Sequence, residues 1–170
     1  MTVTGEEKDM MKNKFELIPV CTLVYGPEGF QMIGETPEGL LGLGIMGEGK
    51  VTGPLLNGIV LRGTQDWSLV RRDGIHRPEC RAVMKTHDDA IIQLSYNGFM
   101  DLGPDGYEQR KAGVRNGPYH PRTMIRMLTE SEAYAWVNRT PFLGIGLLEY
   151  GSPPTVTYDI YQISTPPPGA

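Results

Sequence analysis

The sequence predicts an all-β fold: a single antiparallel β-barrel of about eight to ten strands, with one or two short helical turns. Strand-like runs recur at spacings of roughly 8–15 residues. Glycine and proline, 22 and 14 of 170 residues, are scattered between these runs as turn formers. Little of the chain shows helical periodicity. This pattern also fits a β-sandwich, but flexible glycine corners favour a sheet that curls into a barrel.

With 170 residues, the chain is long enough to form one domain with a single core and too short for two such domains. We expect the barrel to span residues 15–163, between a polar N-terminal tail over residues 1–14 and a proline-rich C-terminal tail over residues 164–170. Proline cannot donate to a strand ladder, so the PPPGA ending is expected to stay outside the sheet.

Turn signals and alternation predict the strands in order. Pro19 in the first strand marks an edge or a bulge, because proline lacks a backbone N–H. Tyr25–Gly29 is predicted to be a turn, and the glycines between residues 39 and 53 predict bent strands. The predicted strands are 15–24, the bent strands within 39–53, 55–62, three runs within 63–98, 122–129, 142–149 and 155–163.

Two segments are expected to differ from strands. Residues 99–121 form a polar, turn-rich connection with room for helical turns around Tyr107–Val114. A loop of this length in a compact domain is usually a lid or a binding loop. Ser131 is a suitable N-cap for a short helical turn that extends to Trp136.

The run from Gly63 to Gly98 predicts a three-stranded meander with turns at Arg72–Gly74 and Thr86–Asp89. Its middle strand alternates, with one mostly charged face and one mostly apolar face: Glu79, Arg81, Val83 and Lys85 against Cys80, Ala82, Met84 and Thr86. If the charged face points into the barrel, it offers polar groups to a ligand. If it points outward, it is an ordinary solvated surface.

Charge and hydropathy argue against two classes of partner. A net charge of −4, with no basic run longer than Arg71-Arg72, is unsuited to nucleic acid or an anionic membrane. The apolar run Phe142–Leu148 is far shorter than the ~20 residues of a membrane-spanning helix. The polar N-terminus lacks the apolar segment of a signal peptide, so we expect a cytoplasmic protein. In that reducing compartment Cys21 and Cys80 are expected to be free, buried thiols.

The order of several motifs resembles a known family. They are Gly53-Pro54-Leu55 with Gly58, Asp66-Trp67, Arg72-Asp73-Gly74, Glu79, Arg81, Thr86, Ala90, Gly98, the run Tyr134–Thr140, and Phe142-Leu143-Gly144. Over about residues 15–163 the chain is similar to the family called domain of unknown function 3237, whose members look like lipocalin-type β-barrels. Glu79 stands where this family more often has aspartate, and Asp89 where it usually has glycine.

The resemblance implies a lipocalin-like barrel and says little about activity, because the family is named for its unknown function. Some barrels of this general kind in fungal and bacterial biosynthetic clusters act as cofactor-free cyclases or isomerases. For this chain that is an analogy at the level of the fold alone.

Four polar residues are the candidate catalytic groups. Glu79 would be the acid or base and Arg81 the anchor for a substrate oxygen, with a structural ion pair as the alternative. Tyr96 would donate its hydroxyl, or else lie in the core with that hydroxyl bound to the backbone. Arg126, flanked by apolar residues on its strand face, would need an acidic partner or an anionic ligand.

Trp67, Trp136, Phe142 and Met84 are the candidate substrate-binding residues. The aromatic side chains would confine a flat or terpenoid-like molecule, whereas core packing is the competing interpretation for them.

No metal or cofactor site is predicted. His76, Glu79 and His87 are residue types that bind zinc or iron, but the first two fall on opposite faces of a strand and His87 lies in a turn. The chain has no P-loop, no dinucleotide-binding glycine motif and no G-x-S-x-G elbow. We therefore expect chemistry that depends on shape and proton transfer.

These observations predict a cofactor-free enzyme that encloses a hydrophobic, polyketide- or terpenoid-like molecule and isomerises, dehydrates or cyclises it, cycloaddition included. Two other functions stay open: a non-catalytic carrier of such a molecule, and a structural barrel with a filled interior. A cavity with converging polar groups would favour the enzyme or the carrier over the structural barrel. The sequence leaves open whether the chain forms a homodimer, and it does not name the substrate.

Overall fold

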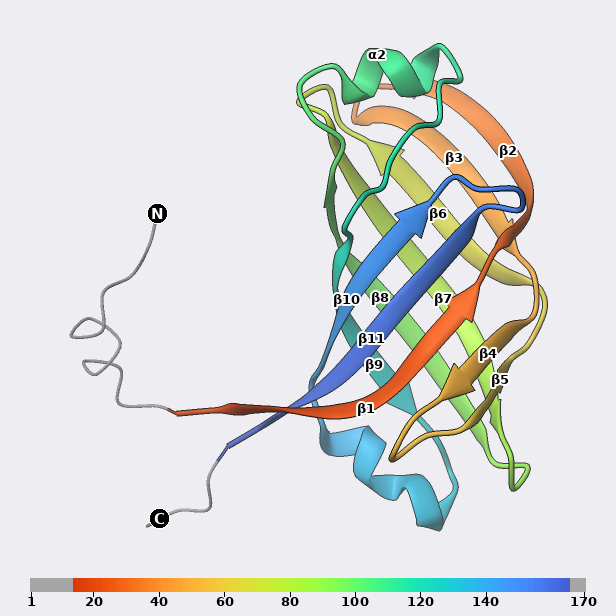
Figure 1. The fold of residues 1–170 in the computed structure, drawn as a ribbon, viewed down its shortest axis with the longest axis vertical. Helices are drawn as coiled ribbons and strands as arrows, with labels where there is room; N and C mark the ends of the chain where they lie inside the picture. The colour runs from red at the N-terminus through yellow and green to blue at the C-terminus, as the bar shows by residue number, and fades with distance from the viewer. Residues whose placement is uncertain (1–13, 166–170) are drawn as a thin grey trace.

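The computed structural model describes residues 14–165, which form a closed antiparallel β-barrel (Figure 1). The predicted fold class is therefore confirmed. The two predicted tails fall mostly on residues 1–13 and 166–170, which lie outside the described residues.

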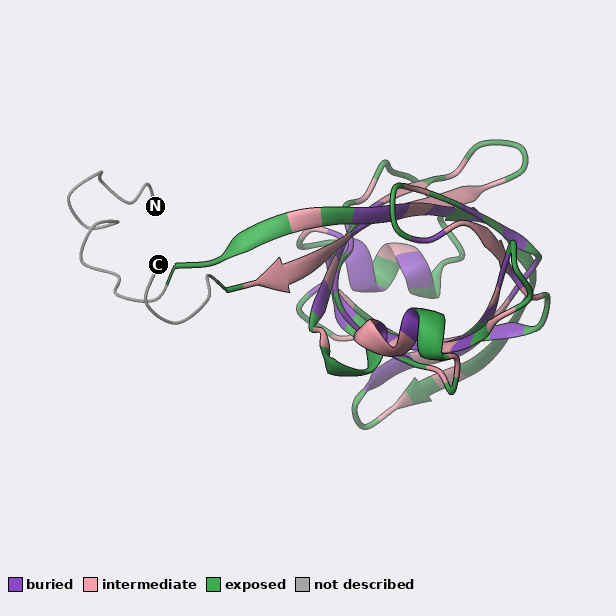
Figure 2. Ribbon diagram, turned by 90° about the horizontal axis from the view of Figure 1, so that it is seen from below, coloured by how far each residue is buried: buried purple, intermediate pink, exposed green. Residues whose placement is uncertain are grey.

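Eight strands close the ring in the order β7-β5-β4-β1-β11-β10-β9-β8, with β8 pairing back onto β7, and Figure 2 looks along this ring. Three further strands, β6, β3 and β2, extend the sheet from β7. The elements are β1 (Glu16–Tyr25), β2 (Pro27–Thr36), β3 (Gly39–Met46), β4 (Gly49–Thr52), β5 (Gly58–Val60), β6 (Thr64–Val70), β7 (Ile75–Thr86), β8 (Ile91–Asp101), α2 (Gly106–Lys111), β9 (Arg122–Leu128), the 3₁₀ helix η1 (Glu132–Arg139), β10 (Phe142–Glu149) and β11 (Thr155–Ser164).

β1 leads into β2, β3 into β4 and β5 into β6, and each such pair takes one place in the ring. The chain therefore follows an up-and-down path around the barrel. β7 pairs with β6 along its first half and with β5 along its second half. β3 and β4 pair in turn with β6 and β5, and β1 joins β4 to β11. β2 pairs with β3 but has no strand partner on its other edge among the described residues.

Most predicted elements are confirmed, including the bulge at Pro19, where the β1–β11 register shifts. Two predictions were wrong. The predicted turn at Tyr25–Gly29 gives way to strand β2 from Pro27 onward, and the strand predicted over 55–62 is only Gly58–Val60. β2 was missed because it is mostly exposed and its apolar alternation is limited to Phe30 and Met32.

The interior is packed solid at the end of the barrel near η1, the light-blue helix at the bottom of Figure 1. Each large apolar side chain buried there contributes roughly 1.5–3 kcal/mol. Fully buried members of this core include Leu56, Met84, Ile92, Leu94, Met127 and Phe142. Cys80 and Cys21 are buried and free, as predicted.

A smaller apolar cluster lies beneath α2 at the opposite end: Leu40, Val70, Met100, Leu102 and Tyr107. Neither helix within residues 14–165 is long and apolar enough to cross a membrane.

Candidate functional site

Glu79, Arg81 and Arg126 lie on the outer wall of the barrel, where all three are exposed. Of the two orientations considered for the charged face of β7, the outward one is therefore observed, and Glu79 and Arg81 do not line the interior. Side chains alternate along β7, and the face that carries Cys80 and Met84 is the buried one. Burying this apolar face is favourable, whereas burying two charged groups is costly.

The structure does bring these three residues together, but outside the barrel. They line one open depression over β7, β8 and β9. Ser95 lies opposite both Arg81 and Arg126 in the strand register. Trp67, opposite Glu79 on β6, is 42% exposed on the same wall and so does not enclose an interior ligand.

The remaining predicted residues point inward, but most belong to the packed core. Met84 and Phe142 are buried, and the half-buried Trp136 packs on Phe142 with ring centroids 5.8 Å apart. None of these three lines the interior cavity described below. Tyr96 faces inward as predicted and is buried.

A cavity of about 210 Å³ lies inside the barrel toward α2. Most of its wall is apolar and comes from β2, β3, β6, β10, β11 and the turn before β11: Phe30, Met32, Leu40, Met46, Val70, Leu148, Pro154 and Val156. Gly42 leaves room for the Phe30 ring in this wall, since a Cβ there would collide with it. The interior of the described barrel therefore contains a cavity, and it lies toward α2.

Polar groups converge on this cavity from three elements. Asp66 and Ser68 come from β6, His76 from β7 and Arg110 from α2. Among the described residues, three buried side-chain polar atoms have no hydrogen-bond partner: Asp66 Oδ1, His76 Nδ1 and Arg110 Nη2. All three residues line the same cavity. Buried polar groups in folded proteins are nearly always paired, so this concentration marks a place for a ligand.

Asp66 is an acid–base group poised near neutral pH. Burial raises the pKa of its carboxyl to about 6, and a hydrogen bond from the Glu79 backbone limits the rise. At pH 7 the carboxyl is mostly ionised but close to its midpoint. General acid–base catalysis is most effective under that condition.

His76 is held neutral in the same cavity wall as Asp66. Its Nε2 and the hydroxyl of Ser68 lie 2.8 Å apart and form a hydrogen bond. Burial, with the positive charges of Arg110 and Arg115, lowers the pKa of His76 to about 3. The imidazole is therefore an uncharged hydrogen-bonding group of the cavity wall, and its buried Nδ1 has no partner among the described residues.

A layer of hydroxyl groups lies on the core side of Asp66. Cys80 and Tyr96 follow Asp66 across the register of β6, β7 and β8. The hydroxyls of Tyr25 and Tyr96 form a buried hydrogen bond, and the Tyr96 ring lies 5.3 Å from that of Tyr158. Burial raises the pKa of Tyr25 and of Tyr96 well above 10, so both remain neutral. Burial also raises the pKa of Cys80 to about 12, which keeps its thiol from acting as a nucleophile.

Arg110 supplies a fixed positive charge at the α2 end of the cavity. It is only 8% exposed, and its guanidinium lies 4.9 Å from the ring centroid of Tyr150 and 5.3 Å from that of Tyr119. Its Nη1 donates to the Val114 carbonyl at 3.4 Å, which leaves Nη2 free. The cation–π contacts hold the guanidinium in place.

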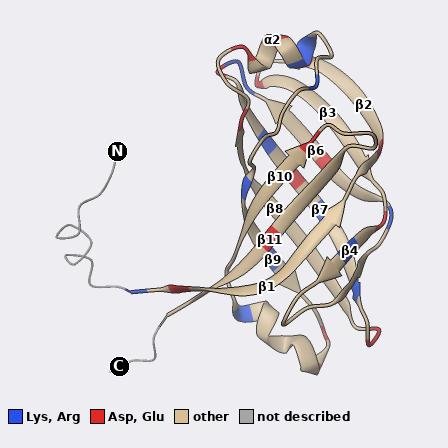
Figure 3. Cartoon of the chain, viewed as in Figure 1, with Lys and Arg blue, Asp and Glu red and all other residues tan. Residues whose placement is uncertain are grey.

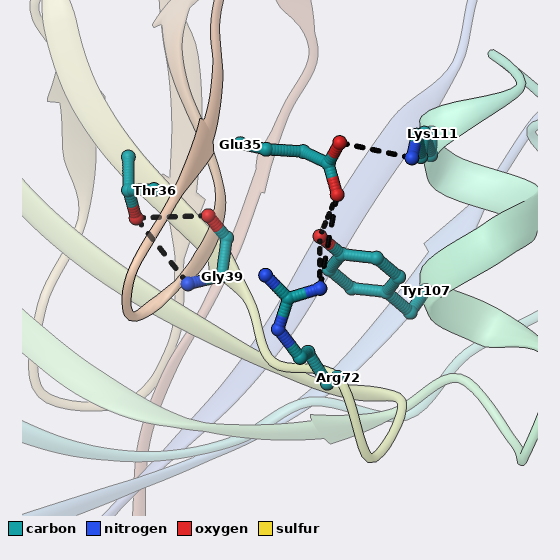
Figure 4. A network of polar contacts seen from close by, with 6 residues as sticks. All are labelled: Glu35, Thr36, Gly39, Arg72, Tyr107 and Lys111. Atoms are coloured by element: carbon teal, nitrogen blue, oxygen red, sulfur yellow. Dashed lines mark hydrogen bonds and ion pairs between the residues drawn. The ribbon is translucent and has the colours of Figure 1, made fainter.

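Glu35 ties the element that carries Arg110 to the rest of the barrel (Figure 4). Its carboxylate accepts a hydrogen bond from Tyr107 at 2.7 Å and pairs with Lys111 at 2.9 Å and with Arg72 at 3.8 Å. The Lys111 and Tyr107 hydrogen bonds lower the pKa of Glu35, so these contacts persist at neutral pH. Charges of both signs accordingly gather around α2 (Figure 3).

The sequence offered only a partial signal for Asp66, His76 and Arg110. His76 lies on the same face of β7 as Cys80 and Met84, so the apolar character of that face could have indicated that His76 points inward. In the sequence, Asp66 stood out only as half of the Asp66-Trp67 motif. Arg110 was only one of several charged residues in the polar connection over residues 99–121. Within residues 14–165 no group of three His, Cys, Asp or Glu side chains is arranged to hold a metal ion.

Comparisons with known proteins place the fold. A curated relative, a UPF0311 protein of Clostridium acetobutylicum, is 34% identical over 91 residues, which cover 52% of this chain and 58% of the relative. The match thus spans little more than half of that relative. The crystal structure of a protein of unknown function from Clostridium acetobutylicum has a TM-score of 0.79 at 27% identity, covering 89% of this chain and all of the other.

A crystal structure of an enzyme from Penicillium herquei has a TM-score of 0.64 at 17% identity, and covers 91% of this chain and 96% of the other. At that identity the likeness concerns the fold alone. A family model described as "Protein of unknown function (DUF3237)" matches residues 15–163, which is nearly all of the described barrel. The chain therefore belongs to the DUF3237 family, as its motifs predicted.

Proposed function

We propose that the barrel is an enzyme that encloses a compact, largely apolar molecule and moves a proton within it, with Asp66 as general base and acid. The observation that carries the proposal is the convergence of three unpartnered buried polar atoms on one apolar cavity. An apolar pocket with a few converging polar groups and a shifted pKa is the usual form of a small-molecule site.

The groups suggest a division of roles. Asp66 Oδ1 takes a proton from an acidic C–H or O–H of the substrate, and the electron pair left behind delocalises onto a substrate oxygen. Arg110 Nη2 and His76 stabilise the charge that develops on that oxygen. Return of the proton at another atom gives an isomer. Expulsion of a protonated hydroxyl gives dehydration, and attack of the anion on an electrophilic carbon gives a ring.

The fold is compatible with this role, because a barrel of similar architecture is an enzyme in Penicillium herquei. A rival function is a carrier that binds the same kind of molecule without reacting. The apolar wall alone would suit either, and the buried carboxyl of Asp66, with its pKa raised to about 6, favours the enzyme because such a group can both take and return a proton near neutral pH.

Proton exchange in D₂O tests the proposal without knowledge of the natural substrate. The full-length protein would be incubated with a panel of compact ketones and enones, and loss of the α-proton signal followed by ¹H NMR. We expect enzyme-dependent exchange for at least one compound, and a loss of roughly 10²–10⁴-fold in Asp66→Asn.

Glu79→Gln is the matched control, because it changes a carboxylate on the outer wall of the neighbouring strand. It should exchange at the wild-type rate. Binding without exchange by the wild-type protein would identify a carrier. Equal exchange by wild type and Asp66→Asn would remove Asp66 from the mechanism.

A further inference from the structure

The cavity carries an excess of positive charge at neutral pH. Two of its lining residues are guanidinium cations, the buried Arg110 and the exposed Arg115, and one, Asp66, is a carboxylate. His76 is neutral, and the pKa of its ring responds to both arginines, so their charges act on the interior. A ligand with one negative charge would neutralise the net charge of these three residues.

Arg110 is built to receive a flat oxyanion. Rings of Tyr119 and Tyr150 lie near the guanidinium, which leaves its edge as the route for hydrogen bonding. Nη2 on that edge is buried and has no partner in the described part of the chain. Guanidinium edges match the planar geometry of carboxylates, and such charge-assisted bonds are stronger than neutral ones.

We infer that the substrate is a compact organic monoanion whose carboxylate binds Arg110 and whose hydroxyl or acidic C–H lies at Asp66. The inference rests on the proposed function, since it names a substrate class for the same site. The rest of the cavity wall, apart from Arg110 and the other polar residues, is apolar, which suits a hydrocarbon or aromatic skeleton. A cation would be repelled by two arginines, and a dianion such as a phosphate monoester would exceed the charge that the site can balance.

Matched acids and amides test this assignment. Calorimetry would compare 4-hydroxybenzoate with 4-hydroxybenzamide, which has nearly the same shape and no charge, and with the dianion phenyl phosphate. We expect the wild-type protein to bind the acid about 10-fold or more tightly than the amide, because a charge-assisted bond is lost in the amide. Phenyl phosphate should bind more weakly than the acid.

Arg110→Gln should abolish the preference for the acid, whereas Arg110→Lys should retain part of it. Arg126→Gln, which removes an arginine from the outer wall, is the control and should keep the full preference. Circular dichroism and thermal unfolding would verify that each variant is folded. Equal affinity for acid and amide, an unchanged preference in folded Arg110→Gln, or no measurable binding of the acid would each overturn the inference.

The outcomes separate this inference from the proposed function. A protein that exchanges protons of neutral ketones and shows no preference for acids would retain the acid–base function and lose the substrate class. A protein that selects acids through Arg110 but exchanges no proton would retain the binding assignment and lose the catalytic role of Asp66.

Discussion

Asp66→Asn is expected to stabilise the barrel at pH 8 while it removes acid–base activity. The pKa of Asp66 is raised from an ordinary value of 3.8 to about 6, so in the window between these values the native state binds the proton more tightly than the unfolded chain. The contribution of this group to stability therefore falls as pH rises through that window. At pH 8 the ionised carboxyl costs about 3 kcal/mol, and an asparagine of similar shape avoids that cost.

Urea unfolding at several pH values would measure this effect. The free energy of unfolding of Asp66→Asn should be close to that of the wild type at pH 4 and exceed it by up to about 3 kcal/mol at pH 8. Glu79→Gln should show no such divergence. A difference that stays constant across the pH range would mean that the carboxyl is not buried in the way described.

His76 changes the stability with pH in the opposite direction to Asp66. Comparing the wild type with Asp66→Asn removes this effect. The pKa of His76 is lowered from 6.5 to about 3, so its contribution is fully present above the unfolded value and is lost as pH falls through this range. Between pH 4 and 6 the two groups therefore offset each other in the wild-type curve. Because both proteins contain His76, their difference isolates Asp66.

Phe142→Ala is expected to destabilise the protein by about 3–5 kcal/mol without changing its chemistry. Phe142 is only 2% exposed, packs against Trp136 and belongs to the core at the η1 end. Truncating it leaves a void in close-packed surroundings, while the cavity at the α2 end keeps all of its lining residues.

Thermal or urea unfolding gives the stability loss, and proton exchange well below the unfolding transition gives the activity of the folded protein. Per folded molecule, exchange should match the wild type. A specific loss of exchange in fully folded Phe142→Ala would restore this residue to the substrate-binding role that its aromatic character suggested.

The fold could be predicted because its determinants are local. Turn signals at Arg72–Gly74 and Thr86–Asp89 bracket β7, and the bulge at Pro19 follows from the missing N–H of proline. Alternation along β7 was also correct. Which face points inward was left open, because the charged residues suggested a site while the apolar residues opposite them suggested burial, and the structure buries the apolar face.

The cavity depends on contacts that no short stretch of sequence encodes. Asp66 lies beside Trp67, and the large apolar ring appeared to be the inward neighbour, yet the register with β7 turns Asp66 inward. Arg110 lies on α2, which Tyr107 and Lys111 dock against Glu35, and the strand of Glu35, β2, was itself not predicted. Long-range pairing therefore decides which polar groups meet.

Titration of Asp66 by ¹³C NMR of carboxyl-labelled protein is the most direct test of the central claim, that a buried acid–base group faces a hollow interior. The account predicts a midpoint at about pH 6 for Asp66. Asp66→Asn, which lacks this carboxyl, would assign the signal to Asp66. A midpoint for Asp66 near the ordinary aspartate value would contradict the account, because it would place that carboxylate in contact with water or a cationic partner.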